Sequence, residues 1–478
     1  MAATRDGSDP SSYASSTEIR TMFSQEMSRM YKLEVPLYGD LLDLISEVNQ
    51  NVLSRDLALR SHLQAQGQLD RLNLERHGAI RLGSREELAI MARFLKVMGM
   101  WPVGFYDLAK AGLPVHATCF RTLDSDSLAH NPFRLFVSVL QLSLLPDDVR
   151  ERTKEVVGRR QIFDDRVLQM IQQAEKDDLR LKRDQAMDFV QLGLATFRWH
   201  GLSTVSLEEY KDLDGQSPLL ADIVCFRGPH INHLTPRTLD IDMVQQLMKT
   251  RGFPTKAAIE GPPRRQCPIL LRQTSFKALK EQINFIQNDG SLIRGAHTAR
   301  FGEVEERGAA LTPKGRQLYD KIVVECQSKG LDSSNENAYK AAFAELPDDW
   351  DSLRVQGLAW FRYSVIDQAN LLSRPKISQD TIDKFDQSIS WLLKSGWMKF
   401  EPIVYEDFLP LSAAGIFASN LGSSKASGSG TSSANKVNNG FEVLQNMIGD
   451  RIRDEMANYA QLQQESLDAC KAILTKLL

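Results

Sequence analysis

The spacing of apolar positions divides the chain into helical and strand-like stretches. Apolar side chains recur at helical spacing over residues 16–75, and the same spacing returns in a charge-rich form over residues 147–215. Shorter apolar runs predict strands, which lie at 79-AIRL-82, 115-VHATCFR-121, 134-RLFVSVLQLSLL-145, 218-PLLADIVCF-226, 269-ILLRQTSF-276 and 300-RFGEVEERG-308. The remainder of the chain is mostly helical in pattern. This mixture predicts an α+β protein.

A histidine followed four residues later by an arginine occurs twice, as His77 with Arg81 and as His233 with Arg237. Each pair precedes one amphipathic helix that ends at a glycine, so the chain carries a weak internal repeat. A strand, a helix and several short strands make up the module βαβββ, and two copies can curl their sheets around one cavity. We therefore predict paired βαβββ modules, with the two histidines facing each other.

The helix of each repeat has recognisable ends. In the first repeat, Ser84 and Glu87 have the spacing of a capping box, and Gly99 marks the end of the helix. In the second repeat, Thr235 as N-cap and Pro236 in the first turn predict a helix that runs to about residue 251.

These patterns divide the chain into five regions. They are a disordered leader at 1–15, an N-terminal helical segment at 16–75, a first module with a helical insertion at 76–215, a second module at 216–320, and a helical C-terminal region at 321–478 that closes the active site. Within the last region, 422-GSSKASGSGTSSANK-436 is rich in Gly and Ser and is predicted to be a flexible surface loop.

Composition narrows the classes of protein. The chain has 478 residues, of which 42% are hydrophobic, so it can bury a large core. A net charge of −3 argues against a nucleic-acid partner. The 5 cysteines are scattered, which argues against a disulfide framework and indicates a reducing compartment. No run reaches the roughly 18 apolar residues that span a bilayer. A cytoplasmic protein without a membrane partner is expected, and the sequence specifies no oligomeric state.

Two imidazoles and one carboxylate from separate strands form a facial triad, which leaves about three positions open on a six-coordinate Fe(II) ion. Side chains alternate along a strand, so only one of His230 and His233 should reach a shared cavity. Glu303 and Glu305 share a strand face, and spacing alone does not decide which of them is the third ligand. His116 is equally suitable by residue type.

Structural interpretations of these residues stand beside the chemical ones. A histidine such as His77 is more often hydrogen-bonded for structure than bound to a metal, and the acidic strand that begins near residue 303 has the composition of a solvated face. Arg81 can pair with Glu75 or Glu86.

Five stretches of the chain closely resemble the 2-oxoadipate dioxygenase/decarboxylase family. They are 74-LERHGAIRLG-83, 94-FLKVMGMWPVGFYDLAKAGLPVHATCFR-121, 226-FRGPHINHLTPR-237, 301-FGEVEERGAALTPKGR-316 and 408-FLPLSAAGIF-417. The resemblance covers roughly residues 20 to 470 and keeps the motifs in order. It implies a vicinal-oxygen-chelate core, similar to that of hydroxyphenylpyruvate dioxygenase and hydroxymandelate synthase.

The resemblance also implies roles for particular residues. The metal ligands of the family fall on His77, His233 and Glu303, with Fe(II) as the cofactor. The substrate arginine falls on Arg81 and a pocket serine on Ser412, while Leu411 beside that serine bears on the size of the pocket.

The implied reaction converts 2-oxoadipate and O2 to 2-hydroxyglutarate and carbon dioxide in lysine catabolism, with both oxygen atoms entering one substrate. Two other classes remain open. The same fold and ligands can serve a metal-dependent lyase or isomerase that uses no oxygen, or the chain can be a non-catalytic binding protein with a relict site. A relict site predicts a missing ligand, whereas all three ligands are present.

Overall fold

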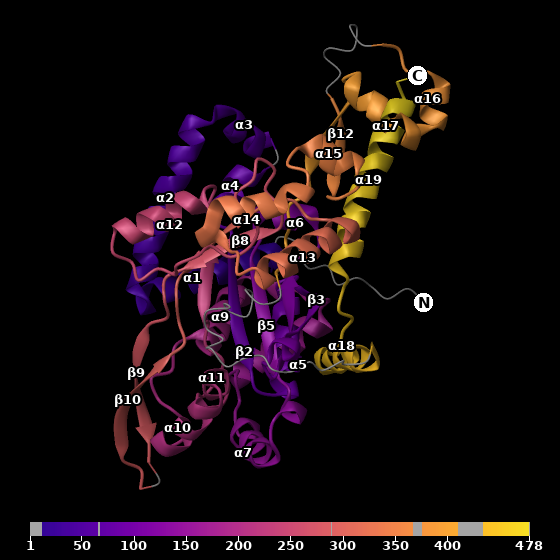
Figure 1. The fold of residues 1–478 in the computed structure, drawn as a ribbon. Helices are drawn as coiled ribbons and strands as arrows, with labels where there is room; N and C mark the ends of the chain where they lie inside the picture. Colours follow the sequence, from indigo (N-terminus) through magenta and orange to yellow (C-terminus); the bar gives the residue numbers. More distant parts are fainter. Residues whose placement is uncertain (1–11, 66, 288, 367–374, 410–433, 478) are drawn as a thin grey trace, which may run out of the picture. The chain divides into compact units, whose positions relative to one another are not determined.

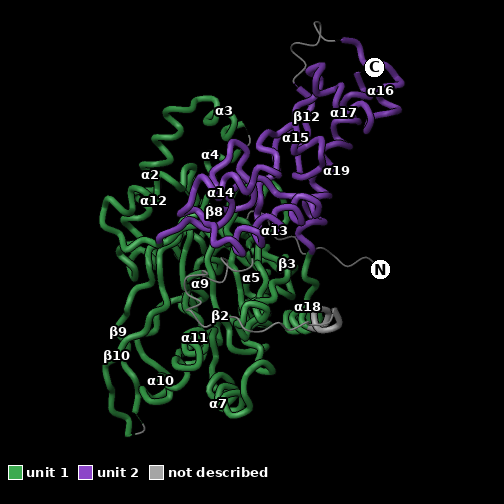
Figure 2. Tube along the Cα trace, viewed as in Figure 1, with its two compact units in different colours: residues 1–256, 273–306, 408–453 green, residues 257–272, 307–407, 454–478 purple. Residues whose placement is uncertain are grey.

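The computed structural model describes residues 12–65, 67–287, 289–366, 375–409 and 434–477 (Figure 1). The chain is a mixed α+β protein that divides into two compact units, each built from separate stretches of sequence (Figure 2). Unit 1 comprises residues 1–256, 273–306 and 408–453, and unit 2 comprises residues 257–272, 307–407 and 454–478. Leu411, Ser412 and positions 422–433 of the expected loop lie outside the described residues.

A five-stranded sheet forms the centre of unit 1, with the order β3-β4-β5-β2-β7. Its strands are β2 (Arg76–Leu82), β3 (Trp101–Asp107), β4 (Val115–Arg121), β5 (Arg134–Leu140) and β7 (His233–Pro236). β2 runs parallel to β5, whereas β3 with β4, β4 with β5 and β2 with β7 are antiparallel. The strands predicted from three apolar runs are therefore confirmed, although the third run ends in a short 3-10 turn at Leu142–Leu144.

Helix α5 (Arg85–Val97) connects β2 to β3, so residues 76–140 run strand, helix, strand, strand, strand. Ser84 caps α5 as predicted by accepting a hydrogen bond from the Glu87 backbone. The Glu87 side chain accepts from the Gly83 backbone instead of completing the capping box at Ser84. Gly99 follows the helix with a φ of +67°, the left-handed conformation that ends helices at little cost to glycine.

The second repeat begins in the same way and then departs from the first. β7 leads to α12 (Ile241–Thr250), and the later strands are β8 (Leu271–Ser275), β9 (Lys280–Ile286), β10 (Leu292–Thr298) and β11 (Glu303–Arg307). β8 pairs with β11, while β9 and β10 form a hairpin of their own. A parallel bridge joins Arg237, just after β7, to Glu305 on β11.

Two predictions in this region are wrong. The helix predicted to start at Thr235 and Pro236 starts at Ile241 with Asp240 as N-cap, because Thr235 and Pro236 pair with β2. The run 218–226, predicted as a strand, contains α11 (Pro218–Val224). A short, fully buried apolar run suits either element, and a proline in the first turn starts the helix.

Helices surround the sheet of unit 1. Besides α5, α11 and α12, they are α1 (Ser16–Glu34), α2 (Pro36–Arg55), α3 (Leu57–Ala65), α4 (Gln68–Leu72), α6 (Ser125–His130), α7 (Asp147–Gly158), α8 (Asp165–Lys176), α9 (Arg183–Leu194), α10 (Leu207–Gln216) and α18 (Ala434–Ile448). α18 takes up the last three positions of the loop expected at 422–436. β1 (Tyr13–Ala14) pairs with β6 (Leu181–Lys182), so regular structure already begins within the leader expected at 1–15.

Aromatic side chains join these helices to one another. Phe94 on α5 stacks on Phe189 of α9 with ring centroids 4.8 Å apart, and Phe23 of α1 meets Phe94 edge-on at 5.6 Å. All three rings are fully buried. Their packing anchors the helix that follows β2 and thereby fixes the end of that strand.

Unit 2 is mainly helical. Its main elements are α13 (Pro313–Ser328), α14 (Glu336–Ala342), α15 (Trp350–Val355), α16 (Gln379–Asp383), α17 (Phe385–Lys394), α19 (Glu455–Thr475) and the antiparallel pair β12 (Phe361–Val365) and β13 (Met398–Pro402). Among the described helices of both units, none combines the length and the apolar character needed to cross a bilayer.

Candidate metal centre

Adjacent strands of the sheet bring two histidines together. β2 and β7 are paired so that Ala79 lies opposite His233, which puts His77 and His233 diagonally across the strand pair. Their rings are fully buried, with centroids 5.3 Å apart. The two histidines of the repeat therefore meet.

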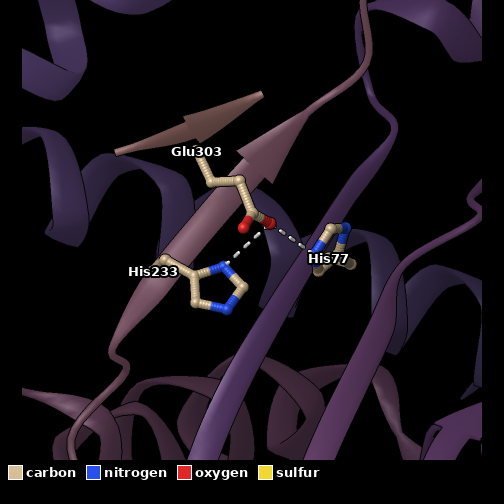
Figure 3. A group of neighbouring side chains, drawn as sticks. All are labelled: His77, His233 and Glu303. Carbon is tan, nitrogen blue, oxygen red and sulfur yellow. Dashed lines mark hydrogen bonds and ion pairs between the residues drawn. The ribbon is translucent and has the colours of Figure 1, made fainter. Parts of the chain in front are cut away.

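A glutamate at the start of β11 completes the group (Figure 3). Glu303 Oε1 lies 3.1 Å from His77 Nε2 and 3.6 Å from His233 Nδ1. The candidate ligand atoms of the three residues all lie within 4.8 Å of one another. Within the part of the chain that the structure describes, no other set of three or more His, Cys, Asp or Glu side chains meets this criterion.

Glu305 shares the strand face of Glu303 but contacts a different atom. Its Oε2 lies 3.0 Å from His77 Nδ1, the nitrogen on the opposite side of the ring from Glu303. This is the arrangement of a metal-bound histidine whose second nitrogen is held by an outer carboxylate. The geometry therefore favours Glu303 over Glu305 as the candidate ligand.

The donor atoms suit a divalent cation. Among the described residues, His233 Nε2 and Glu303 Oε2 are buried and have no hydrogen-bond partner, a costly condition that a bound ion would relieve. Glu303 Oε1 is oriented by Thr235 Oγ1, which donates to it at 2.8 Å, and by Gln273 Nε2, which donates at 2.9 Å. Two imidazoles with one carboxylate match the ligand set of mononuclear Fe(II) sites.

Burial and charge set the protonation states in this group. Burial lowers the pKa of His233 to about 4, so its imidazole is neutral, as a metal ligand must be. Burial opposes the charged form of Glu303, but His233 and His77 outweigh burial and lower its pKa. Burial also acts to lower the pKa of His77, yet the carboxylates of Glu305 and Glu303 outweigh it and raise that pKa.

Apolar rings shield the group from water. Phe408 meets His77 edge-on with ring centroids 4.8 Å apart, and Phe301 stacks on His233 at 4.9 Å. Both phenylalanines are at most 5% exposed. A dry surrounding strengthens the electrostatic interactions of whatever ion or substrate binds there.

The two arginines of the repeat have different partners. Arg81 Nη1 donates to Asp222 Oδ2 at 2.5 Å, a partner that the sequence did not indicate. Arg237 instead donates to Glu75 at 3.1 Å. Arg81 and His77 are four positions apart on β2 and therefore share a face of the strand. The positive charge of Arg81 contributes to the low pKa of His233.

The other candidate histidines lie elsewhere. His230 lies before β7, where strand alternation does not apply, and its Nε2 is 3.1 Å from Asp222 Oδ1. His116 Nε2 is 3.5 Å from Asp107 on the neighbouring strand.

A family model described as 2-oxoadipate dioxygenase/decarboxylase matches residues 23–420 of the chain. The chain belongs to the 2-oxoadipate dioxygenase/decarboxylase family. A curated member of that name from Pseudomonas putida is 48% identical over 470 residues, which cover 97% of this chain and 98% of the relative. The relative of that name in Escherichia coli is 45% identical over 454 residues, or 95% of this chain and 98% of the relative.

Solved structures of the family have the same fold. The crystal structure of the hydroxyglutarate synthase from Pseudomonas putida in complex with 2-oxoadipate superposes with a TM-score of 0.84 at 46% identity, covering 97% of this chain and 99% of that one. The family resemblance inferred from the five sequence motifs is thereby confirmed.

Several residues around the centre were not predicted. Gln273 and Thr235 orient Glu303, and Asp222 holds Arg81. No signal in the sequence singled out Gln273, because Arg272, Thr274 and Ser275 beside it are polar as well. The signal for Asp222 was the single charged residue of the run 218–226.

Proposed function

We propose that this chain catalyses the Fe(II)-dependent conversion of 2-oxoadipate and O2 to 2-hydroxyglutarate and carbon dioxide. The observation that carries the proposal is the buried His77, His233 and Glu303 group in a chain whose Pseudomonas putida relative was solved with 2-oxoadipate. The atoms balance, since the six-carbon acid loses its carboxyl carbon as carbon dioxide and gains two oxygen atoms, one in the new carboxylate and one in the hydroxyl group.

His77, His233 and Glu303 are the proposed ligands. A centre of this kind supplies open coordination positions at which a 2-oxo acid and dioxygen can meet. The residues behind the ligands hold them in place, because Glu305 faces the far nitrogen of His77 and Gln273 donates to Glu303. The surrounding phenylalanine rings exclude water from the reaction.

Arg81 is the proposed partner of a substrate carboxylate. Its guanidinium is always protonated and has the planar geometry that grips a carboxylate with two hydrogen bonds. Ser412 is proposed to add a neutral hydrogen bond to the substrate, with Leu411 limiting the length of acid that fits; both stand in the motif 408–417 that resembles the family.

We also propose that the two repeats are copies of one βαβββ module. The parallel pairing of β2 with β5 puts Arg81 opposite Ser138, and the parallel bridge from Arg237 to Glu305 is its counterpart in the second repeat. Each copy contributes one histidine to the centre. The two arginines contact different residues, so the two copies have diverged in the role of this position.

The proposal is tested by loading the purified protein with Fe(II) under anaerobic conditions and recording oxygen uptake with 2-oxo acids of increasing length. We expect uptake to be fastest with 2-oxoadipate and to match 2-hydroxyglutarate formed. Conversion of the acid without oxygen uptake would indicate a lyase or isomerase instead. Iron binding without conversion of any acid would indicate a binding protein.

A further inference from the structure

A second buried polar cluster lies around Asp222 on α11. Asp222 is 7% exposed, and its two carboxylate oxygens have different partners. Oδ2 accepts from Arg81 Nη1 at 2.5 Å and from Asn232 Nδ2 at 3.3 Å. Oδ1 lies 3.1 Å from His230 Nε2 and 2.9 Å from His297 Nε2. Four side chains from three segments of the chain thus converge on one carboxylate.

The two ring nitrogens of His297 have different partners in this cluster. His297 Nε2 donates to Asp222, so the other ring nitrogen, Nδ1, is the acceptor for Tyr210 Oη at 2.9 Å. Burial acts to raise the pKa of Asp222, but His230 and Arg81 outweigh burial and hold it well below its usual range.

We propose that Asp222 is the positioning residue of Arg81, fixing its guanidinium toward the metal centre before substrate arrives. The proposal rests on the proposed function, in which Arg81 grips a substrate carboxylate. It assigns Asp222 no contact with the reacting atoms.

The chemistry of arginine explains why such a residue is useful. The arginine side chain has four rotatable torsions, and ordering them on binding would weaken the grip on a small acid. Asp222 orders the side chain in advance. A guanidinium has five N–H donors, so a bond from Nη1 to Asp222 is compatible with a two-pronged grip on a second carboxylate.

The residues that contact Asp222 fix the position of its carboxylate. Asn232 is the residue before the ligand His233, and it ties the same carboxylate oxygen that holds Arg81. The bonds of His230 and His297 fix the other oxygen, which prevents the carboxylate from rotating away. The cluster therefore sets Arg81 relative to the segment that carries His233.

The test uses Asp222→Asn, which keeps the shape of the side chain and removes its charge. Three properties are measured: iron content, the Kd for 2-oxoadipate in an anaerobic titration of the Fe(II)-loaded protein, and the conformation of Arg81 in crystal structures of wild type and variant. We expect unchanged iron content, a displaced guanidinium, and a Kd weakened on the order of 10- to 100-fold.

A double-mutant cycle separates positioning from a general structural role. If Asp222 acts through Arg81, then Asp222→Asn should have no further effect on the Kd in the Arg81→Ala background. An equal loss in both backgrounds, or a guanidinium that does not move, would overturn the proposal. If Asp222→Asn does not fold, His297→Phe removes one bond to the opposite carboxylate oxygen and should give a smaller loss that also vanishes with Arg81→Ala.

Glu87→Gln is the matched control. Glu87 is a buried carboxylate that accepts two bonds from Arg160, at 2.8 and 2.9 Å, and we have assigned it no part in the metal centre. The control should lower the melting temperature without changing the Kd. If the wild-type protein does not bind or convert 2-oxoadipate, the proposed function fails, and the crystallographic result alone decides whether Asp222 positions Arg81.

Discussion

Glu303 and Glu305 lie on one face of β11 but contact different nitrogens of His77. Periodicity predicted that Glu303 and Glu305 point the same way, and both lie beside His77. Periodicity could not choose between them, because the choice depends on which nitrogen of the histidine each carboxylate faces. Which nitrogen each carboxylate faces is determined only when β11 and β2 lie side by side in the folded chain.

The first prediction concerns bound iron. His77→Ala, His233→Ala and Glu303→Ala should each abolish stoichiometric iron binding, since each removes one ligand of three. Glu305→Gln should retain iron with an affinity lowered roughly 10- to 100-fold, the usual effect of losing an outer carboxylate. The metal content is measured after reconstitution and dialysis.

His116→Ala serves as the control for this series and should retain full iron content, because His116 pairs with Asp107 on another strand. Full iron content in Glu303→Ala together with none in Glu305→Ala would show that the ligand was wrongly chosen.

The second prediction concerns stability. Glu75 is fully buried and accepts hydrogen bonds from Arg71, Arg134 and Arg237. Glu75→Gln would leave three buried guanidiniums around a neutral side chain, so the free energy of unfolding should fall by about 3–5 kcal/mol. Chemical denaturation measures the change. The exposed pair of Glu155 with Arg159 is the control, and a Glu155→Gln loss as large as that of Glu75→Gln would contradict this explanation.

The third prediction concerns Arg81. A charge-assisted hydrogen bond to a carboxylate contributes roughly 1.5–3 kcal/mol, so Arg81→Ala should lower kcat/KM on the order of tenfold to a hundredfold or more while iron stays bound. Arg81→Lys keeps the charge but loses the planar fork, and should be intermediate.

The same variants locate the carboxylate that Arg81 holds. A much smaller loss with a 2-oxo acid that lacks the second carboxylate would put Arg81 at the distal end of the substrate, and equal losses would put it at the keto-acid end. Unchanged kinetics with a lowered melting temperature would reduce the residue to a structural ion pair with Asp222.

Among the elements, five of the six short runs predicted as strands contain a strand, and only the run 218–226 does not. Capping residues predicted the ends of α5 closely, and the run 115–121 coincides with β4, although all but one of its residues are buried. Residues 219–226 of the run 218–226 are all buried, so their burial does not distinguish a strand from a helix. Because this run was predicted as a strand, the sequence did not indicate where the side chain of Asp222, its one charged residue, points.

The start of β11 depends on a close approach that only glycine permits. A Cβ atom added to Gly302 would lie 2.0 Å from the buried ring of Phe276, whose backbone N–H donates to the Gly302 carbonyl. Gly302→Ala should therefore destabilise the protein by about 1–3 kcal/mol and weaken iron binding through the adjacent Glu303. Thermal denaturation and metal content check both effects.

Gly215→Ala is the control for this substitution. Gly215 lies in α10 and no atom lies within 4 Å of the added Cβ, so alanine should leave stability unchanged or raise it slightly. If Gly302→Ala melts at the wild-type temperature with full iron content, the close approach does not limit the position of β11.

At the scale of the whole molecule, sequence predicted the components better than their assembly. The motifs identified the family and the three candidate ligands, which come from stretches of the chain that lie far apart. The division into two units was not predictable, because each unit collects segments from three parts of the chain that are joined only by long-range packing. The hydrophobic pattern records local periodicity and carries no information on such pairings.

The proposed reaction places both atoms of dioxygen in one pair of products formed from a single 2-oxo acid, and both of them in 2-hydroxyglutarate. The most direct measurement is mass spectrometry of 2-hydroxyglutarate formed from 2-oxoadipate by the Fe(II)-loaded protein under ¹⁸O-labelled dioxygen. The proposed reaction predicts two heavy oxygen atoms in 2-hydroxyglutarate, one in the hydroxyl group and one in the new carboxylate, and none in the carbon dioxide released. A product that forms without label, or whose hydroxyl oxygen comes from water, would contradict it.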